Sequence, residues 1–137
     1  MNYEDIFNDS YSRVLKGEID GKNFFDLFYD KFIGSSPFVK EKFKNTKLEK
    51  QKEKVKKSFY HLIQFFVTKN VSPYMENIAK VHSKNKMDIE PYLYDFFAQS
   101  LIDAIKEFDT EFCDDVELSW RMVLSAGITY MKFQYDK

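Results

Sequence analysis

Glycine and proline are scarce in this chain, and their scarcity limits what the chain can fold into. Its 137 residues include 4 Gly and 3 Pro, against 15 Phe and 9 Tyr. A protein of many short strands needs frequent turn residues, whereas long helices need few breaks. The composition therefore favours an all-α fold in which long helices are joined by short connections.

Apolar residues recur at the helical spacing of three and four positions along most of the sequence. The pattern predicts helices over residues 3–16, 20–33, 37–43, 48–69, 73–82 and 90–108, and a last helix from 114 onward. Ser-Pro pairs at positions 36–37 and 72–73 are typical helix starts, and Asp114 followed by Glu117 predicts a capping box. We expect seven or eight helices in one domain covering residues 1–137.

Charge and cysteine content bear on the class of protein. The net charge of −1 gives no electrostatic reason to expect a nucleic-acid partner, and the lone Cys113 cannot form an internal disulfide. No basic-then-apolar leader opens the chain, and no apolar run approaches the roughly 18 residues of a membrane-spanning helix. We expect a soluble cytoplasmic protein with no nucleic-acid partner and no membrane partner.

One histidine, His82, lies in line with Ile78 on the apolar face of the helix over residues 73–82. Residues three and four apart share a helix face, so the imidazole points where the apolar side chains point. Such a ring either finds hydrogen-bond partners in the core or gives one nitrogen to a metal or haem iron. Taken alone, His82 favours the first interpretation.

Two more polar side chains, Tyr29 and Gln51, interrupt apolar stripes on other helices. An inward-facing amide costs free energy unless it is hydrogen-bonded, so Gln51 needs a partner. A metal site made of side chains alone would need several His, Cys, Asp or Glu ligands, and this set contains one. The set is typical of a cofactor that brings its own four ligands, such as haem. His82 would then be the fifth ligand, with Tyr29 and Gln51 aimed at the open side.

With these residues in place, the sequence resembles the globin family, and in particular single-domain bacterial globins and the globin portion of flavohaemoglobins. The motifs that carry the resemblance occur in the family's order from Phe25 to Tyr135, nearly the whole chain. They are Phe28-Tyr29-Asp30, Pro37 with Phe43, Gln51, Ile78-Ala79-x-x-His82, Ile89-x-Pro91-x-x-Tyr94, and Trp120 with Gly127 and Met131.

The resemblance implies that His82 is the proximal ligand of haem b and that Tyr29 and Gln51 are the distal pair. It also implies the residues that surround the haem: Phe43 on its face, Val55 beside the open coordination site, Lys54 near a propionate, and Ile78, Val81, Ile89, Tyr94 and Phe97 around them. In isolation, Phe43 is better explained as ordinary core, and a solvated Lys54 is an equally good explanation. His61, ten residues beyond Gln51, is turned off the stripe and is expected to be peripheral.

One departure from the family pattern bears on function. In flavohaemoglobins a glutamate on the last helix polarises the proximal histidine together with the tyrosine that matches Tyr94. The corresponding residues 131–135 contain no acid here. Such a carboxylate strengthens the imidazole as a donor and favours O–O chemistry. We also expect Nδ1 of His82 to donate to a backbone carbonyl one turn earlier, that of Ile78.

Three functions follow from these expectations. The first is reversible binding of oxygen, and of nitric oxide or carbon monoxide, at ferrous haem iron. The alternative is a nitric oxide dioxygenase that depends on a separate reductase, because the chain stops where a reductase domain would begin. The third is a haem-free globin fold that acts as an interaction module, which the retention of His82 disfavours.

Charge is unevenly distributed along the chain. Residues 40–57 hold nine lysines and three glutamates, whereas residues 88–117 hold ten acids and one lysine. A lysine-rich helix face is commonly only a solvated surface. On the globin arrangement it would also flank the exposed haem edge, where it could steer an acidic electron donor.

Overall fold

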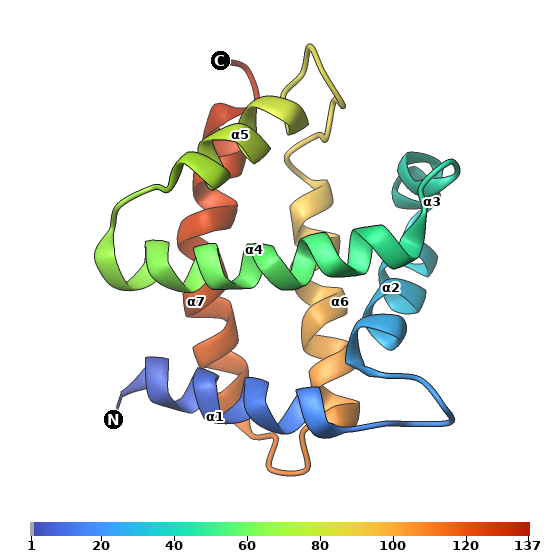
Figure 1. The fold of residues 1–137 in the computed structure, drawn as a ribbon, viewed down its shortest axis with the longest axis vertical. Coiled ribbons are helices and arrows are strands. Elements are labelled where there is room, and N and C mark those ends of the chain that lie inside the picture. The colour runs from blue at the N-terminus through green and yellow to red at the C-terminus, as the bar shows by residue number, and fades with distance from the viewer. Residues whose placement is uncertain (1) are drawn as a thin grey trace.

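The computed structural model describes residues 2–137, and that part of the chain forms seven helices and no strand (Figure 1). The expected all-α fold is confirmed for these residues. In chain order the helices are α1 (Tyr3–Lys16), α2 (Phe24–Gly34), α3 (Pro37–Phe43), α4 (Leu48–Thr68), α5 (Pro73–His82), α6 (Leu93–Phe108) and α7 (Asp114–Gln134).

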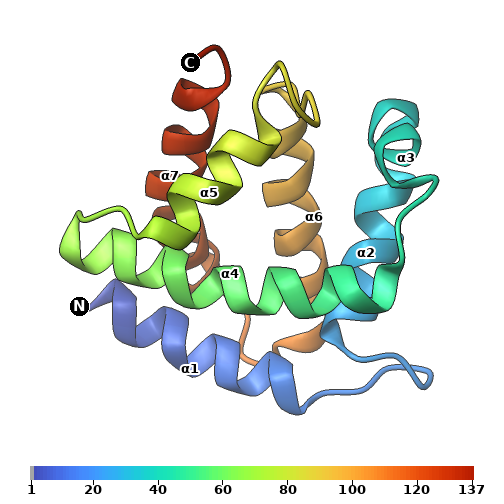
Figure 2. The ribbon, with the colours of Figure 1, turned by 45° about the horizontal axis from the view of Figure 1, so that its top comes forward.

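The helices do not form a single parallel bundle: α6 and α7 run roughly alongside each other, and α1 and α4 cross them steeply (Figure 1). Two views show α4 passing in front of both α6 and α7, with α5 crossing near one end of α7 (Figures 1 and 2). Helix α2 packs on α6, and α7 is packed by α1, α4 and α5. No helix among residues 2–137 combines the length and apolarity that crossing a membrane requires.

The core is built from aromatic side chains around Trp120, which is fully buried. Its indole lies 4.5 Å from the ring of Phe7, and its Nε1 donates to the hydroxyl of Ser10 at 2.9 Å. That hydroxyl donates to the buried carboxylate of Asp109 at 2.6 Å, which Arg13 also contacts at 2.6 and 2.9 Å. This network ties α1 to α7 and to the end of α6.

Most helix boundaries agree with the sequence pattern, but two helices begin later than expected. Helix α2 begins at Phe24 because Asp20 and Gly21 adopt positive φ angles of 52° and 79° in a turn. Asn23 and Asp26 then form the capping box that starts the helix. Helix α6 begins at Leu93 and not at residue 90, because the residues before it are held in turns.

The capping box expected at the start of α7 is wrong. The helix does begin at Asp114, but its N-cap is Cys113 and no side chain caps it. The carboxylate of Glu117 instead accepts from Arg121, 2.9 Å away on the next turn. Acidic side chains in the first turn stabilise a helix through its dipole even when they form no capping bond. Asp114 and Glu117 can therefore mark a helix start without forming a capping box.

Gly127 marks a close approach of three helices. A Cβ atom at this position would lie 2.0 Å from Cδ2 of Leu62 on α4 and 3.3 Å from Cε of Met75 on α5. The missing side chain therefore lets α4 and α5 rest directly on α7. The same contact fixes the position of α5, the helix that carries His82.

Candidate functional site

His82 is the last residue of α5. The helix starts where the Ser72 side chain accepts from the amide of Met75 with Pro73 in the first turn, and it ends because Ser83 is extended. Nδ1 of His82 lies 3.1 Å from the hydroxyl oxygen of Tyr94 on α6. The expected bond to the Ile78 carbonyl is therefore wrong, because the hydroxyl of Tyr94 occupies that position. Hydrogen bonds within residues 2–137 reach only this nitrogen of the ring, so Nε2 remains available.

Burial fixes the protonation state of this pair. It lowers the pKa of His82 from 6.5 to about 4, so the imidazole is neutral near pH 7. It also raises the pKa of Tyr94 well above 10.0, so the hydroxyl keeps its proton. A neutral imidazole with one nitrogen held by a partner and the other free is the form that binds a metal.

The loop that follows His82 is held from two other helices. Lys42 on α3 donates to the backbone carbonyl of Asp88 at 2.6 Å and pairs with Glu90 at 3.1 Å. The hydroxyl of Tyr135, just beyond α7, donates to the Asp88 carboxylate. Sequence analysis missed these contacts, because the residues lie tens of positions apart and carry no motif. They limit how far the end of α5 can move.

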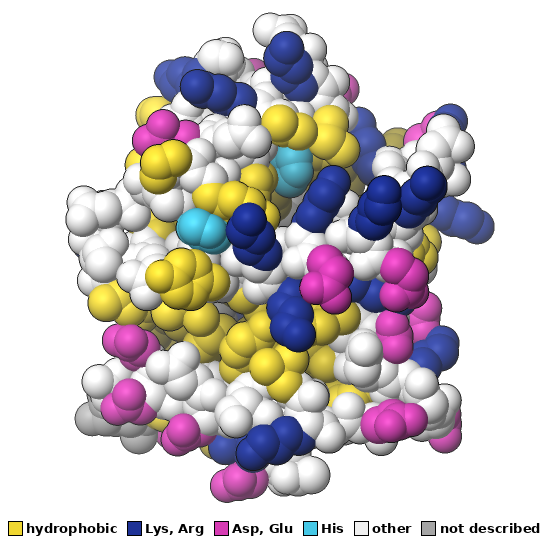
Figure 3. Space-filling view, in the orientation of Figure 1, with side chains coloured by type: hydrophobic (Ala, Val, Ile, Leu, Met, Phe, Trp, Pro, Cys, Tyr) yellow, Lys and Arg dark blue, Asp and Glu magenta, His cyan; other side chains and the backbone are white. Residues whose placement is uncertain are grey.

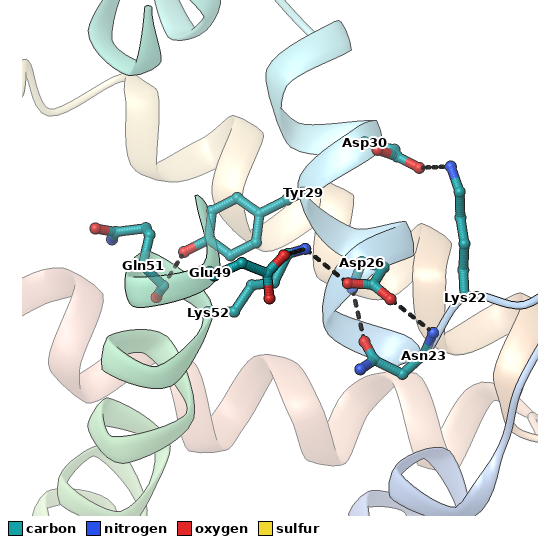
Figure 4. Close-up of polar contacts among 8 residues, drawn as sticks. All are labelled: Lys22, Asn23, Asp26, Tyr29, Asp30, Glu49, Gln51 and Lys52. Carbon is teal, nitrogen blue, oxygen red and sulfur yellow. Dashed lines mark hydrogen bonds and ion pairs between the residues drawn. The ribbon is translucent and has the colours of Figure 1, made fainter. Parts of the chain in front are cut away.

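Tyr29 projects from the buried face of α2 toward the first turn of α4 (Figure 4). It is only 2% exposed, and its hydroxyl donates to the backbone carbonyl of Gln51 at 3.4 Å. Burial raises the pKa of Tyr29 well above 10.0, so the hydroxyl remains a donor. The half-buried side chain of Gln51 extends away from α2 (Figure 4).

An aromatic wall adjoins Tyr29. The ring of Phe43 lies 5.8 Å from that of Tyr29 and 5.5 Å from that of Phe32. Phe32 in turn lies 5.6 Å from Phe97 on α6. The structure thus brings Phe43 and Phe97 together through Phe32, a residue that was not among the expected site residues.

The remaining expected site residues differ in exposure. Val55 is buried, Ile78 and Ile89 are half-buried, Lys54 is exposed, and Val81 is 40% exposed. Among residues 2–137, hydrogen bonds and ring contacts join Tyr29 to Gln51 and Phe43, and His82 to Tyr94. They do not connect these two groups to each other.

The two histidines lie on the same face of the molecule, among hydrophobic side chains and beside a hollow (Figure 3). His61 is engaged elsewhere: its Nδ1 lies 3.0 Å from the hydroxyl of Ser72, and its ring stacks on Tyr74 at 4.2 Å. Two surface depressions, of about 420 and 270 Å³, are lined by other parts of the chain and include no expected site residue.

The donor set can be tested against the expected cofactor. No group of three His, Cys, Asp or Glu side chains that could hold a metal ion occurs within residues 2–137. A single available imidazole nitrogen beside an apolar, histidine-bearing face does not suit a metal bound by side chains alone. It does suit haem, which supplies four ligands itself and takes a fifth from the protein.

Comparisons with known proteins bear on the fold. No protein-family model matches the sequence, and no curated protein matches it. One crystal structure does match, that of a protein from Pseudomonas aeruginosa PAO1 described as structurally highly homologous to a human hemoglobin. The two chains are 30% identical, the match covers 99% of this chain and 100% of that one, and the TM-score is 0.89. The order of the helices in this protein and the likeness over its whole chain establish that the protein belongs to the globin family.

Proposed function

We propose that this globin binds haem b through Nε2 of His82 and binds oxygen reversibly at the ferrous iron. The observation that carries the proposal is the state of His82, whose Nδ1 lies 3.1 Å from the Tyr94 hydroxyl while its Nε2 is free. With Nε2 on the iron, Nδ1 keeps the ring proton and donates it to the Tyr94 oxygen. The low pKa of His82, about 4, keeps the ring neutral at the pH where it must act.

Haem, when bound, would supply the iron that binds oxygen, nitric oxide or carbon monoxide. Tyr29 and Gln51 are proposed to donate hydrogen bonds to the gas molecule. The present bond from Tyr29 to the Gln51 carbonyl is long, at 3.4 Å, so the hydroxyl loses little by turning to a ligand. Its raised pKa supports a donor role.

The apolar residues have a different role in the proposal. Phe43, Val55, Ile78, Val81, Ile89 and Phe97 are proposed to contact the haem and keep water from it, while the exposed Lys54 reaches a propionate. Exclusion of water slows oxidation of ferrous iron, which a reversible carrier requires. This role also accounts for exposed hydrophobic side chains close to His82 in the sequence, such as Val81 at 40% and Met87 at 52%.

The alternative, a nitric oxide dioxygenase served by a separate reductase, fits less well. Oxygen activation is favoured by a carboxylate that hydrogen-bonds the proximal imidazole. Here the partner of Nδ1 is the neutral hydroxyl of Tyr94, and the nearby carboxylate of Asp88 is bonded by Tyr135. The geometry therefore favours ligand binding over oxygen activation.

Absorption spectra of the reconstituted protein test the proposal. Addition of haem should give a Soret band in the ferric form that shifts reversibly on reduction, oxygenation and removal of oxygen. The absence of a Soret band would contradict the proposal and would indicate a globin fold that binds no haem. Steady-state consumption of nitric oxide with a reductase and NADH would instead support the dioxygenase.

A further inference from the structure

Four lysines at the start of α4 form what we call the lysine ridge: Lys47, the residue just before the helix, and Lys50, Lys54 and Lys57 within it. Successive residues of an α-helix are turned by about 100°, so the three lysines within α4 project within about 60° of one another. All four are exposed. The lysines of α4 are therefore not spread evenly around the helix.

The lysine ridge carries positive charge that the chain does not neutralise. The lysines of residues 40–57 that form ion pairs are Lys42, Lys44 and Lys52, with partners both inside and outside this segment. No lysine of the ridge forms an ion pair within residues 2–137. The ammonium group of Lys57 lies 4.9 Å from the centre of the Tyr74 ring, which is a cation–π contact. Four exposed lysines that form no ion pair within residues 2–137 thus lie close together.

The acidic part of the chain is compensated in part. Between residues 88 and 117, salt bridges to Lys or Arg engage six of the ten acids: Glu90, Asp95, Glu107, Asp109, Glu111 and Glu117. The net charge of −1 therefore does not describe the lysine ridge, where four positive charges lie close together. A positive field of this kind attracts anionic partners over roughly one Debye length.

The lysine ridge lies beside the proposed haem site. Gln51 is on the same helix, turned by about 60° from Lys54, so the ridge borders the face that carries the distal residue. On the histidine-bearing face, Lys and Arg side chains border the hollow (Figure 3). A protein bound to the ridge would therefore be close to the edge of a bound haem.

We propose that the lysine ridge is the docking surface for an acidic electron-donor protein. This rests on the proposed function, because a ferrous oxygen carrier oxidises slowly and must be reduced again. One electron leaves the donor, which is oxidised by one electron, and ferric iron becomes ferrous; no bond is formed or broken. The ridge contributes by orienting the donor and concentrating it at the haem edge.

Binding of flavodoxin, an acidic flavin protein, tests the docking surface directly. The dissociation constant is measured by titration calorimetry at ionic strengths of about 0.01 M and about 0.15 M, between which the Debye length falls from roughly 30 to roughly 8 Å. The triple variant Lys47→Gln, Lys50→Gln, Lys57→Gln, which leaves Lys54 to its proposed propionate contact, should weaken binding about 10-fold or more at low ionic strength. The matched control Lys16→Gln, Lys106→Gln, Lys137→Gln, which removes equal charge off the ridge, should leave the dissociation constant unchanged.

Three results would overturn the docking proposal. The first is that the parent does not bind flavodoxin at low ionic strength, and the second is that both triple variants weaken binding equally. The third result is that the ridge binds phosphatidylglycerol vesicles in preference to flavodoxin. The Soret band of the same samples reports separately on haem. A missing Soret band with flavodoxin binding that still depends on the ridge would overturn the proposed function and retain the docking surface.

Discussion

The hydroxyl of Tyr94 lies 3.1 Å from Nδ1 of His82 and is the direct polar link between α6 and the end of α5. The two residues are separated in the chain by a loop that Lys42 and Tyr135 hold in place. A hydrogen bond to Nδ1 orients the imidazole ring and leaves Nε2 as its free nitrogen. The relationship makes the role of His82 and the role of Tyr94 separately testable.

Replacement of His82 by glycine should remove the proximal ligand without adding bulk. We expect the variant to lose haem on gel filtration and to regain a Soret band when imidazole is added, because free imidazole can occupy the vacated space. Haem retention and an absorption spectrum identical to the parent's, with no response to imidazole, would falsify the assignment of His82.

Replacement of Tyr94 by phenylalanine should preserve haem binding but alter it. Loss of an outer hydrogen bond to a metal ligand typically costs about 10- to 100-fold in affinity, so haem should dissociate about 10-fold faster or more. The iron–histidine stretching frequency of the ferrous form should fall, because the imidazole becomes a weaker donor. Tyr92→Phe is the matched control, since that tyrosine is 42% exposed and bonded to Glu90. Equal effects of the two substitutions would show that Tyr94 has no specific role at the haem site.

The helices could be predicted well because their signals are local. Apolar residues at a period of 3.6 and the Ser-Pro starts at 36–37 and 72–73 gave α1, α3, α4 and α5 close to their observed bounds. The sequence pattern predicts starts of α2 and α6 that are too early. The helix-like spacing of apolar residues continues into residues that form turns before each helix. Asp20, for example, has a φ of 52°, which the apolar pattern cannot reveal.

The contacts of the site could be predicted only in part. Helical spacing gives the face on which a residue lies, so it indicated that Tyr29 and His82 point inward. It does not give the partner across the interface. Tyr94 replaced the expected Ile78 carbonyl because α6 brings its hydroxyl to Nδ1, and Lys42 reaches Asp88 across more than forty positions.

Replacement of Tyr29 by phenylalanine should speed the loss of oxygen. A hydrogen bond to a charged group contributes roughly 1.5–3 kcal/mol, and about 1.4 kcal/mol is tenfold in an equilibrium constant. The oxygen dissociation rate, measured by stopped flow, should therefore rise about 10- to 150-fold. Bound carbon monoxide is less polar, so its dissociation should change far less. Equal responses of the two gases would favour a steric role for Tyr29, and no response of oxygen would remove it from the distal site.

Replacement of Asp109 by asparagine should destabilise the fold and change its response to acid. Burial alone would raise the pKa of Asp109, but hydrogen bonds from Arg13 and Ser10 outweigh it and hold the pKa below 3.8. Loss of the charged acceptor should cost roughly 1.5–3 kcal/mol of the free energy of unfolding near pH 7, measured by urea denaturation.

The pH dependence of Asp109→Asn follows from the sign of that shift. Because the folded pKa is below the unfolded one, the unfolded chain binds more protons between the two values, so stability rises with pH across that range. The contribution of Asp109 is complete above about pH 4 and is lost as the pH falls through the lower, folded value. The difference in free energy of unfolding between the parent and Asp109→Asn should therefore shrink as the pH falls below about 4. Asp103→Asn, whose carboxylate accepts only from Gln99 at the surface, is the control and should leave the acid response of the parent in place. A gap between the parent and Asp109→Asn that stays constant down to the acid transition would show that the carboxylate's charge does not stabilise the join between α1, α6 and α7.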